Sequence, residues 1–514
     1  MCFGVGDGVD EYAPNMNEII TNNMFGRLDI YASFDEITPD NVVSELNSAL
    51  VYHVQNLLQE NYLYWYRRNV QPILGRKKEV RPEILYKVQE NHADEIVTFK
   101  NGWFLQSPAF FVSRRKGVQS KVNKLNEYLY RSGKQQADNE IANWFHTVGK
   151  AALYVQPNDD TDVPFLAYAL DPRSAFVVYS MRPGNEPMMG VNFVVADEKA
   201  KFDVYTKDYV FHLSGTTTGK MMTTQIAGDF IASASVIDSI EPNVLGYIPI
   251  IEYRYNDINM GAFEAVLPIL DSINAVQSNR LEGIEGFIQS LAVAVNCRFD
   301  DDTTANDIRK AGMIVLKSVG ENKADFKILS EQLDQQQTQV LVDYLYEQVL
   351  RICAMPAQTK GTRSTSDTGA AVLARDGWFQ AAAAARNTED LFKKSNRQFE
   401  RIIVDILRRK NLLDISLNDF DLEISREETA NIQSKAQAFQ TLMAAGFHPE
   451  LAAKKSGVSN DPAADIKMSD AYLKMIWGDP RSVDKAEQTN GGEGEAQIIE
   501  ADNFNGENDT GGAV

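Results

Sequence analysis

The chain has 514 residues, of which 44% are hydrophobic, and a formal net charge of -20. This length predicts several domains, and the apolar content is enough to bury their cores. Phosphate binding depends on Lys and Arg, so 71 acidic against 51 basic residues exclude a protein that grips nucleic acid over its whole surface, though not a local contact. No apolar run approaches the ~20 residues of a membrane span, and the first residues do not resemble a secretory signal. We therefore expect a cytosolic protein without a membrane partner.

The first half of the chain is predicted to contain a polar arm, one helix and a mixed region. Asp40 is a candidate N-cap for the helix, whose apolar residues recur every three or four positions. These residues are Val43, Leu46, Leu50, Val54 and Leu57. From about residue 70 to 255, short β-rich runs such as SAFVVYS alternate with turn residues and helical pieces. This pattern predicts an α+β domain.

Two amphipathic helices follow, separated by a small β-rich insert. Residues 260–291 carry apolar side chains at a helical period, with Pro268 near the start, where a missing N–H donor is best tolerated. Residues 292–330 contain the runs VAVNCRF and MIVLKSV around a DDD turn. A second helix is predicted over residues 332–353. Together these segments predict a helical hairpin with a β-structured tip.

Residues 356–366 differ from the stiff segments on both sides. They combine Pro356 and Gly361 with several Ser and Thr residues and the two cations Lys360 and Arg363. Glycine and small polar residues are typical of mobile connections. We therefore predict a flexible basic loop.

The C-terminal part is predicted to be mostly helical. Residues 367–410 lack proline and contain an alanine run, which predicts one very long helix bent at Gly377. A shorter helical region is predicted over residues 427–477. From residue 478 the composition is Gly, Glu, Asn, Asp and Thr with few apolar residues, so we expect an acidic disordered tail.

Motifs for nucleotide binding are incomplete. The run SGTTTGKMM at 214–222 is one residue short of a phosphate-binding loop and has Met221 where a metal-binding hydroxyl should stand. A hairpin turn between two strands is the preferred interpretation. The run GVGDG near the N-terminus lacks a preceding strand, so it does not predict a dinucleotide site. No cofactor is predicted.

Candidate metal ligands and nucleophiles are sparse. The aspartates at 300–302 could bind a divalent cation, but an acidic run at a turn is more typically solvated. The histidines show no HExxH or paired spacing and are expected to be hydrogen-bonded or surface residues. They are His53, His92, His146, His212 and His448. Cys2, Cys297 and Cys353 are expected to be free thiols. We predict neither a metal site nor a catalytic residue, and hence no enzyme.

Several stretches, in order, resemble the portal proteins of tailed double-stranded DNA bacteriophages of the siphophage type. They are NVQPILGRKKEVRPEILYKVQENHADEIVTFKNGWFLQSPAFFV at 69–112, LDPRSAFVVYS at 170–180, and LGYIPIIEYRYN followed by AFEAVLPILDSINAVQSNRLEGIE within 245–285. The order of predicted elements also agrees from about residue 40 to 475.

The resemblance implies an elongated, multidomain α+β portal fold. The implied parts are an N-terminal arm (1–39), an α+β wing (40–259), a first stem helix (260–291), a small α/β clip (292–330), a second stem helix (331–355), a tunnel loop (356–366), a long spanning helix of the wing (367–413), a helical crown (414–477) and an acidic disordered tail (478–514).

The same resemblance implies a structural conduit without catalytic activity. Portal proteins form a homo-oligomeric ring, usually of twelve copies, at the unique capsid vertex, and double-stranded DNA enters and leaves through its channel. The implied partners are the terminase large subunit, head-completion or connector proteins, and the major capsid and scaffolding proteins. The implied location is the virion, after assembly in the host cytoplasm.

Two sets of site residues follow from this resemblance. The tunnel-loop residues implied to face DNA are Gln358, Thr359, Lys360, Gly361, Thr362 and Arg363. Mobile residues beside two cations suit transient contacts with phosphates, although an ordinary helix–helix connection with solvated cations is the alternative. The clip cations that could line the exit or bind an acidic partner surface are Arg309, Lys310, Lys317, Lys323 and Lys327. A solvated surface is the alternative for them.

Two other functions remain open at this point. One is a connector or scaffold ring of a virus-like assembly that passes no DNA, and an open axial channel seen by electron microscopy would separate it from a portal. The other is a nuclease within the wing, which metal-dependent cleavage of DNA would reveal.

Overall fold

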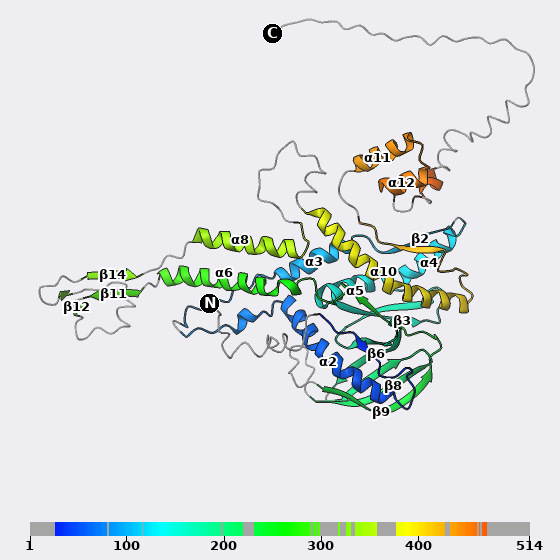
Figure 1. The fold of residues 1–514 in the computed structure, drawn as a ribbon, viewed down its shortest axis with the longest axis horizontal. Coiled ribbons are helices and arrows are strands. Elements are labelled where there is room, and N and C mark those ends of the chain that lie inside the picture. Colours follow the sequence, from blue (N-terminus) through cyan, green and yellow to red (C-terminus); the bar gives the residue numbers. More distant parts are fainter. Residues whose placement is uncertain are drawn as a thin grey trace, which may run out of the picture. The chain divides into compact units, whose positions relative to one another are not determined.

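The computed structural model divides the chain into two compact units, Met1–Asn431 and Ile432–Val514 (Figure 1). The residues that the structure describes are 26–79, 82–115, 117–196, 199–218, 231–288, 291–295, 297–298, 317–318, 325–329, 335–356, 377–426, 432–459, 462 and 465–469. Helices and sheets are mixed along the first unit, which confirms the predicted α+β class.

The larger sheet has six strands in the order β1-β5-β6-β7-β8-β9. Neighbouring strands are antiparallel except β1 and β5, which are parallel. The strands are β1 (Ile30–Tyr31), β5 (Ala175–Tyr179), β6 (Pro187–Ala196), β7 (Lys199–Tyr205), β8 (Tyr209–Thr218) and β9 (Ile231–Pro242). Helix α2 (Val42–Arg67) packs its apolar side against this sheet. Leu46, Leu50 and Leu57, which the sequence placed on one helix face, are all buried in this core.

The start of α2 differs from the prediction by one residue. Asn41 is the N-cap in place of Asp40. The Asn41 side chain accepts a hydrogen bond from the Thr38 N–H at 2.8 Å and donates one to the Glu36 carbonyl at 2.9 Å. The Asp40 prediction is wrong because the following asparagine organises the turn that leads into the helix.

Asparagine side chains on helices bind both backbone groups of single residues in extended segments. In each case the carboxamide oxygen accepts from the N–H and the carboxamide nitrogen donates to the carbonyl of the same residue. The pairs are Asn47 with Ala234 at 2.8 and 3.0 Å, Asn56 with Leu28 at 2.7 and 2.9 Å, and Asn126 with Phe111 at 2.9 and 2.9 Å. Each carboxamide takes the place of a neighbouring strand at that residue, so these edge positions are already satisfied within the chain.

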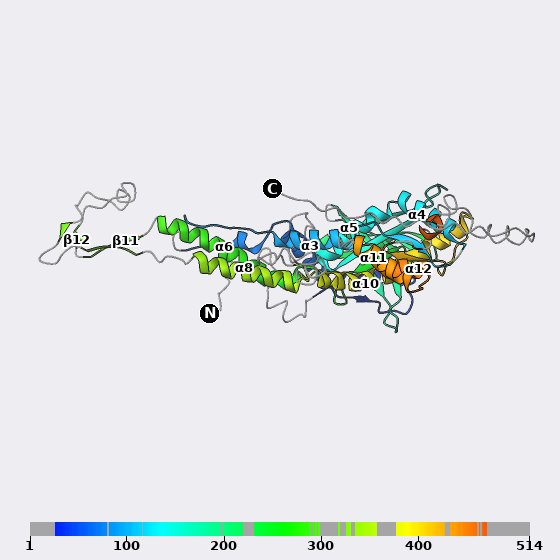
Figure 2. The ribbon, with the colours of Figure 1, turned by 90° about the horizontal axis from the view of Figure 1, so that it is seen from above.

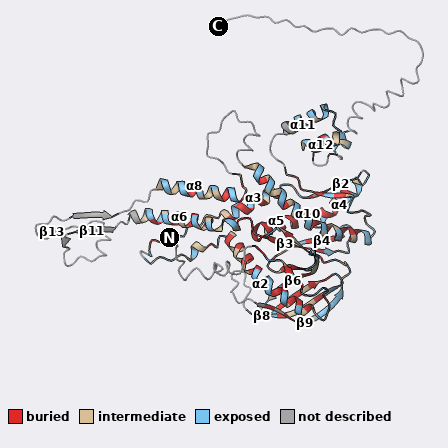
Figure 3. Cartoon of the chain, viewed as in Figure 1, coloured by how far each residue is buried: buried red, intermediate tan, exposed pale blue. Residues whose placement is uncertain are grey.

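A second, three-stranded sheet supports the largest core of the first unit. Its strand order is β10-β3-β4, and both pairings are antiparallel. Helices α4, α5 and α10 contribute to this core, together with the short β2–β15 ladder. The elements are β2 (Phe110–Ser113), β3 (Lys150–Pro157), β4 (Phe165–Leu170), β10 (Ile250–Arg254), β15 (Phe420–Glu423), α4 (Gln119–Arg131), α5 (Lys134–Val148) and α10 (Trp378–Arg409). In Figure 3 the buried residues gather where these helices meet the strands.

An ion pair is buried between α5 and α10. The Lys134 ammonium binds the Asp138 carboxylate one helical turn away, and each residue is 3% exposed. The Lys134 nitrogen also lies 4.7 Å from the ring centroid of Phe399 and 5.7 Å from that of Phe392, both on α10. Burial raises the pKa of the Asp138 carboxyl, and the Lys134 charge opposes this rise. The pair is stable only because each charge has its partner.

A third core joins α3 (His92–Phe104) to the helices α6 (Leu267–Ile288) and α8 (Gln335–Ile352). Figures 1 and 2 both show α6 and α8 side by side. The two helices were predicted, but α6 begins later than residue 260 because the 3-10 turn η2 (Glu264–Val266) precedes it. Between α6 and α8, β11 (Leu291–Val295) pairs with β14 (Asp325–Leu329), and β12 (Cys297–Arg298) pairs with β13 (Lys317–Ser318).

Two glycines allow a tight junction of chain segments just before α6. Gly149 has a φ of +91°, and a Cβ there would lie 2.0 Å from the Asn259 carbonyl oxygen. A Cβ on Gly261 would lie 2.4 Å from the Thr147 carbonyl oxygen. Both values are shorter than any normal contact, so the backbone of 259–261 fits against the end of α5 only in the absence of side chains.

A buried arginine ties the N-terminal segment to the same junction. Arg27 donates to the Val148 carbonyl at 3.0 Å and forms an ion pair with Glu264, and its own side chain is 0% exposed. The Arg27 N–H also donates to the Asn259 carbonyl at 3.1 Å. Arg27 therefore holds together three segments, which are its own N-terminal segment, the end of α5 and the residues that lead into α6.

The run SGTTTGKMM begins in strand β8, which pairs antiparallel with the next strand β9, and the predicted turn between the two strands falls outside the described part. Residues 214–218 form the end of strand β8, and no turn begins at Gly215. A Cβ on Gly215 would lie 1.9 Å from the Ser233 carbonyl oxygen, at an irregularity between β8 and β9. The glycine is required by close approach of two strands, and not by a turn. Residues 219–222 of the run lie outside the described part.

The long C-terminal helix of the first unit is also corrected in one detail. α10 begins after Gly377, which is its N-cap in the left-handed conformation with a φ of +81°. The sequence predicted a bend at this glycine within a longer helix. Left-handed backbone ends a helix and does not bend it, so the residue marks a boundary. Residues 367–376 lie outside the described part.

The second unit contains the helices α11 (Ile432–Ala444) and α12 (Pro449–Ser456). His448 caps α12 by accepting a hydrogen bond from the Glu450 N–H, and Pro449 occupies the first helical position, where it is best tolerated.

The strand β15 lies within the range 414–477, and it pairs with β2 in the first unit. The tail predicted from residue 478 lies outside the described part.

Candidate functional site

Most predicted site residues lie outside the described part of the chain. This holds for Gln358, Thr359, Lys360, Gly361, Thr362 and Arg363, and for Arg309, Lys310 and Lys323. Lys317 lies in β13 opposite Arg298, and Lys327 lies in β14 opposite Val293. These two cations are therefore placed on different ladders. The described residues that flank residues 292–330 and 356–366 show how the ends of these two segments are anchored.

The two residues that flank the segment 357–376 lie near each other. Residues 357–376 connect Pro356 to Gly377. A Cβ built on Gly377 would lie 3.8 Å from the Met355 carbonyl oxygen and 3.8 Å from the Pro356 Cα. The two ends of the intervening segment therefore lie close together. We call residues 353–356 and 377–378 the loop root.

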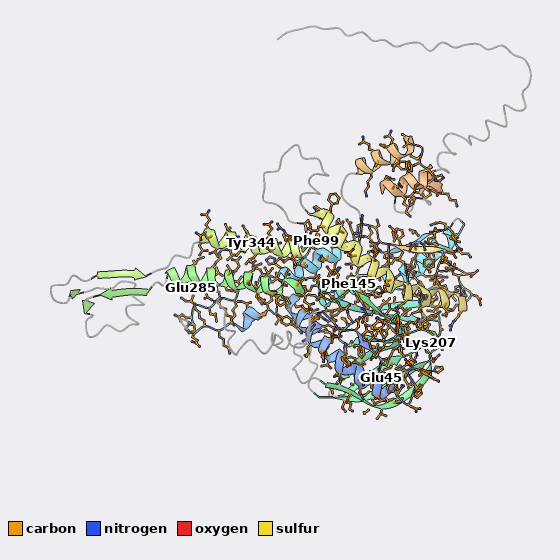
Figure 4. All side chains as sticks on the ribbon, in the orientation of Figure 1. Glu45, Phe99, Phe145, Lys207, Glu285 and Tyr344 are labelled. Atoms are coloured by element: carbon orange, nitrogen blue, oxygen red, sulfur yellow. The ribbon has the colours of Figure 1, made fainter. Side chains whose placement is uncertain are left out.

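Buried side chains anchor both halves of the loop root. On the first side, Cys353 and Met355 are buried in the core that α3, α6 and α8 share. On the second side, the Trp378 ring lies 5.0 Å from the Trp103 ring and 6.1 Å from the Phe99 ring of α3. Phe99 is labelled in Figure 4. These side-chain contacts hold both ends of the segment in place.

A small cavity of about 20 Å³, lined mainly by aromatic and alanine side chains, lies beside the loop root. Its lining residues are Phe99, Lys100, Trp103, Phe104, His146, Tyr255, Ala354, Ala381, Ala384, Ala385 and Thr388. This volume has room for about one water molecule. Burial lowers the pKa of Lys100 and holds the pKa of His146 well below its usual range. The cavity disfavours charged forms and therefore suits a packed interior better than a site for an ionic ligand.

The nearby thiol is similarly inert. Burial raises the pKa of Cys353 to about 11, so the thiol is neutral at physiological pH. The sulfur donates a weak hydrogen bond to the Ala262 carbonyl at 3.6 Å. Cys353 is a free cysteine, as predicted. Cys2 and the side chain of Cys297 lie outside the described part.

Helices α6 and α8 pack through apolar residues and one polar bridge. Leu270 and Ile273 of α6 and Val349 of α8 are buried in their shared core. Farther along, the Arg280 side chain donates to the side-chain oxygens of Gln335 at 3.1 Å and Gln339 at 2.8 Å. Arginine holds five donors in a planar fork, so one side chain fixes the register of both helices.

An extended segment is fastened along α6 by a ladder of side chains. Backbone N–H groups of alternate residues donate to α6 residues spaced four apart. The bonds are Glu90 N–H to Asn274 at 2.8 Å, Val88 N–H to Ser278 at 2.9 Å and Tyr86 N–H to Glu282 at 3.2 Å. Two extended residues rise about 6.6 Å and one helical turn about 5.4 Å, so the two spacings nearly match. We call residues 86–90 the strap.

Glu282 also neutralises two cations at the far end of the strap. It is bridged by Lys78 at 2.9 Å and by Arg76 at 3.3 Å. Its side chain is 8% exposed, so the two cations compensate a largely buried carboxylate. The adjacent Tyr86 hydroxyl donates to Glu285, labelled in Figure 4. Both strap and helix are thereby held in one position.

We expect the substitution Asn274→Leu to loosen the strap. Leucine is of similar size but leaves the partly buried Glu90 N–H without its acceptor, which costs about 1 kcal/mol. Hydrogen exchange measured by mass spectrometry should show faster exchange over residues 86–90. Asn279→Leu is the control, because the Asn279 carboxamide oxygen accepts from Arg76 and contacts no strap backbone. Equal exchange in the strap of both variants would contradict the ladder.

The described histidines each have a partner, as predicted. His53 is buried and lies 3.0 Å from the Arg173 carbonyl, and burial lowers its pKa to about 4. His92 lies between Glu90 and Glu95, whose hydrogen bonds raise its pKa against the opposing effect of burial. The ring nitrogens of His146 and His212 lie 2.5 and 2.7 Å from Asn101 and Asp203, respectively. Among the described residues, no group of three His, Cys, Asp or Glu side chains could hold a metal ion. The aspartates at 300–302 lie outside this part.

Comparison with known proteins decides the family. A family model described as "Phage portal protein, SPP1 Gp6-like" matches residues 55–476, which is most of the chain. The chain belongs to this family of phage portal proteins. The resemblance read from the sequence is therefore confirmed. Portal proteins are structural components that form rings in capsid assemblies.

Solved structures similar to this portal-family chain come from gene transfer agent particles. One, described as "Neck of empty GTA particle computed with C6 symmetry", is 10% identical with a TM-score of 0.42 and covers 72% of this chain and 91% of its own. Another, described as "Virion of native gene transfer agent (GTA) particle", is 11% identical with a TM-score of 0.39 and covers 72% and 90%. No curated protein sequence matched the chain.

No described helix of this portal-family chain has the length and apolar character needed to cross a membrane.

Sequence reasoning missed two features of the site region, the strap ladder and the loop root. The ladder had a signal in Asn274, Ser278 and Glu282, three polar residues spaced by four along α6. The loop root had none, because the closeness of its ends depends on the packing of α3, α8 and α10.

Proposed function

We propose that copies of this chain form a ring at a capsid vertex and that double-stranded DNA passes through its channel during packaging and ejection. The family match over residues 55–476 carries this proposal. In it, α6 and α8 form the stem, residues 292–330 the clip, residues 356–366 the tunnel loop and α10 the spanning helix. Residues 414–477 form the crown.

The outward faces of α6 and α8 support association of copies through the stem. Six apolar residues on these two helices are exposed, with exposed fractions from 42% to 65%. They are Leu281, Ile284, Val340, Leu341, Tyr344 and Ile352. Tyr344 is labelled in Figure 4. A ring requires two different faces of each copy to meet, and large exposed apolar side chains on two antiparallel helices provide such faces.

The loop root supports a moving contact with DNA. Lys360 and Arg363 belong to the segment 357–376, and the described residues that flank this segment lie close together. The proposed DNA contact therefore requires no displacement of α8 or α10. Each phosphate that a cation neutralises strengthens binding, so two cations per copy give weak, reversible contacts where a densely basic lining would retain the DNA. The net charge of -20 is consistent with a channel that releases its cargo.

The clip is proposed to face the packaging motor and later the connector. Its candidate contacts are the cations predicted from sequence, which are Arg309, Lys310, Lys317, Lys323 and Lys327. The proposed partners are the terminase large subunit, head-completion proteins, and the major capsid and scaffolding proteins. Assembly would take place in the host cytoplasm.

The decisive experiment replaces both tunnel-loop cations. In capsids assembled with the Lys360→Ala and Arg363→Ala double variant, we expect DNA retention after packaging stops to fall about tenfold or more, because every copy in the ring loses its phosphate contacts. Retention is measured as nuclease-protected DNA per capsid. The control is Lys199→Ala with Lys201→Ala, which removes two exposed cations from β7. Unchanged packaging and retention in the tunnel-loop variant would refute the assigned role.

Electron microscopy of the same capsids distinguishes the alternative function. An annulus with an axial channel wide enough for a duplex supports the portal proposal. An annulus closed by packed side chains would indicate a connector or scaffold ring that passes no DNA.

A further inference from the structure

We propose that the exposed side of α10 is a second binding surface for double-stranded DNA, separate from the tunnel loop. The surface consists of Arg386, Lys394, Arg397, Arg401 and Arg408, and we call it the α10 stripe. All five residues are exposed. Figure 3 shows how exposed and buried residues alternate along this helix. The proposal goes beyond the channel, since it does not depend on any residue between 356 and 366.

The five cations share one narrow side of the helix. At 100° per residue they fall within an arc of about 80°, and at 1.5 Å per residue they extend over about 33 Å. Asp390 is the one acidic residue within this arc. This length is close to one turn of duplex DNA. In a chain of net charge -20, such a concentration of positive charge is a local exception.

The other acidic residues of α10 point elsewhere and have their own partners. Glu389 binds Lys393 at 2.7 Å and also Arg426. Asp405 binds Arg409 at 2.7 Å. Among the residues that the structure describes, none of the five stripe cations forms an ion pair. Asp390 within the arc and Glu400, whose carboxylate interacts electrostatically with Arg397, therefore offset only part of the five positive charges.

The stripe weakens the isolated helix. Arg397 and Arg401 are four residues apart and Lys394 and Arg397 three apart, and like charges at these spacings repel. Asp390, four residues from both Arg386 and Lys394, and Glu400, three residues from Arg397, relieve this repulsion only in part. An external anion removes the repulsion, so the pattern favours an anionic partner.

A nucleic acid fits this surface better than an acidic protein does. Protein interfaces centre on buried aromatic or aliphatic anchors. Every exposed residue of α10 between 386 and 409 is polar or charged. Four of the five stripe cations are arginines, whose planar fork matches phosphate oxygens. A straight row of cations without apolar anchors corresponds to a linear polyanion.

Binding of the full-length protein to a labelled 40-base-pair duplex tests the proposal, with fluorescence anisotropy recorded from 50 to 200 mM salt. The variant carries Arg386→Gln, Arg397→Gln and Arg401→Gln, which keep good helix formers in place. We expect at least tenfold weaker binding at 50 mM salt, and a slope of log K against log salt that is shallower by about 2.7 for three lost phosphate contacts.

The matched control removes the same charge from another exposed place. Lys199→Gln, Lys201→Gln and Lys207→Gln change the surface of β7 and the turn after it, and Lys207 is labelled in Figure 4. We expect this control to shift the slope by less than 1. An equal shift in both variants, or no binding by the unchanged protein, would overturn the proposal.

Two further measurements separate other outcomes. If sedimentation shows that the α10 variant loses its assembled state while the control keeps it, the stripe contacts another copy, and the DNA proposal is overturned. The Lys360→Ala and Arg363→Ala variant in the same assay should leave the stripe-dependent part of the slope intact. Packaging defects in that variant concern the channel, so failure of either proposal is recognised independently of the other.

Discussion

The substitution Gly149→Ala is expected to destabilise the first unit by on the order of 4 kcal/mol. Alanine at a φ of +91° is strained by about 1–3 kcal/mol. Its Cβ would also lie 2.0 Å from the Asn259 carbonyl oxygen and 2.5 Å from the Asn259 carbonyl carbon. Backbone atoms have little freedom to move aside, so overpacking adds about 1–3 kcal/mol. The effect should appear as a lower midpoint of thermal unfolding, by several degrees.

Gly102→Ala is the matched control for this experiment. Gly102 lies in α3, and a Cβ there meets no atom within 4 Å. Alanine in an exposed helix interior is favoured over glycine by about 1 kcal/mol, so the midpoint should stay equal or rise. An unchanged midpoint for Gly149→Ala would show that the junction before α6 tolerates a side chain, contrary to its geometry.

The second large effect is expected for Lys134→Met. Methionine keeps the length of the side chain but leaves the Asp138 carboxylate buried without its partner. Breaking a buried pair in this way costs about 3–5 kcal/mol. The loss should depend on pH, because burial already raises the pKa of Asp138 and removal of Lys134 raises it further. An acid with a raised pKa in the folded state destabilises that state as pH increases above its unfolded value.

The free energy of unfolding of this variant should therefore be closest to that of the unchanged protein near pH 4. The difference should grow as pH rises toward neutrality. Urea unfolding at several pH values measures it. The double variant Lys134→Met with Asp138→Leu is the control, since an apolar pair of similar volume removes the orphaned charge and should recover most of the stability. A pH-independent loss would argue that Lys134 acts through its packing against Phe399 and not through its charge.

Helical periodicity predicted the long elements because tertiary packing uses the same faces that the sequence marks. Leu46, Leu50 and Leu57 are examples, and both hairpin helices were anticipated. The local errors share a cause. Asp40 and Gly377 were assigned from residue type alone, but whether a residue caps or ends a helix depends on its backbone angles and on its neighbour's hydrogen bonds. The need for glycine at position 215 was not predicted, because the approach of Ser233 from another strand leaves no mark within the run.

Less of the candidate site than of the fold could be predicted from the sequence. The family resemblance rests on several stretches distributed over the chain, and the family match confirms it. The assignments of Lys360 and Arg363 remain predictions. The α10 stripe was not anticipated, because its cations are interrupted by buried residues in the sequence and become one surface only on the helix.

The closeness of Gly377 to the Met355 carbonyl allows the length of the segment between them to vary. Since the segment between them starts and finishes at one place, its length is not constrained by the distance between α8 and α10. Doubling such a segment adds only about 0.6 kcal/mol to the entropy of closing it. Related chains could therefore carry longer or shorter versions on the same framework, and a peptide tag inserted there should leave the surrounding cores intact.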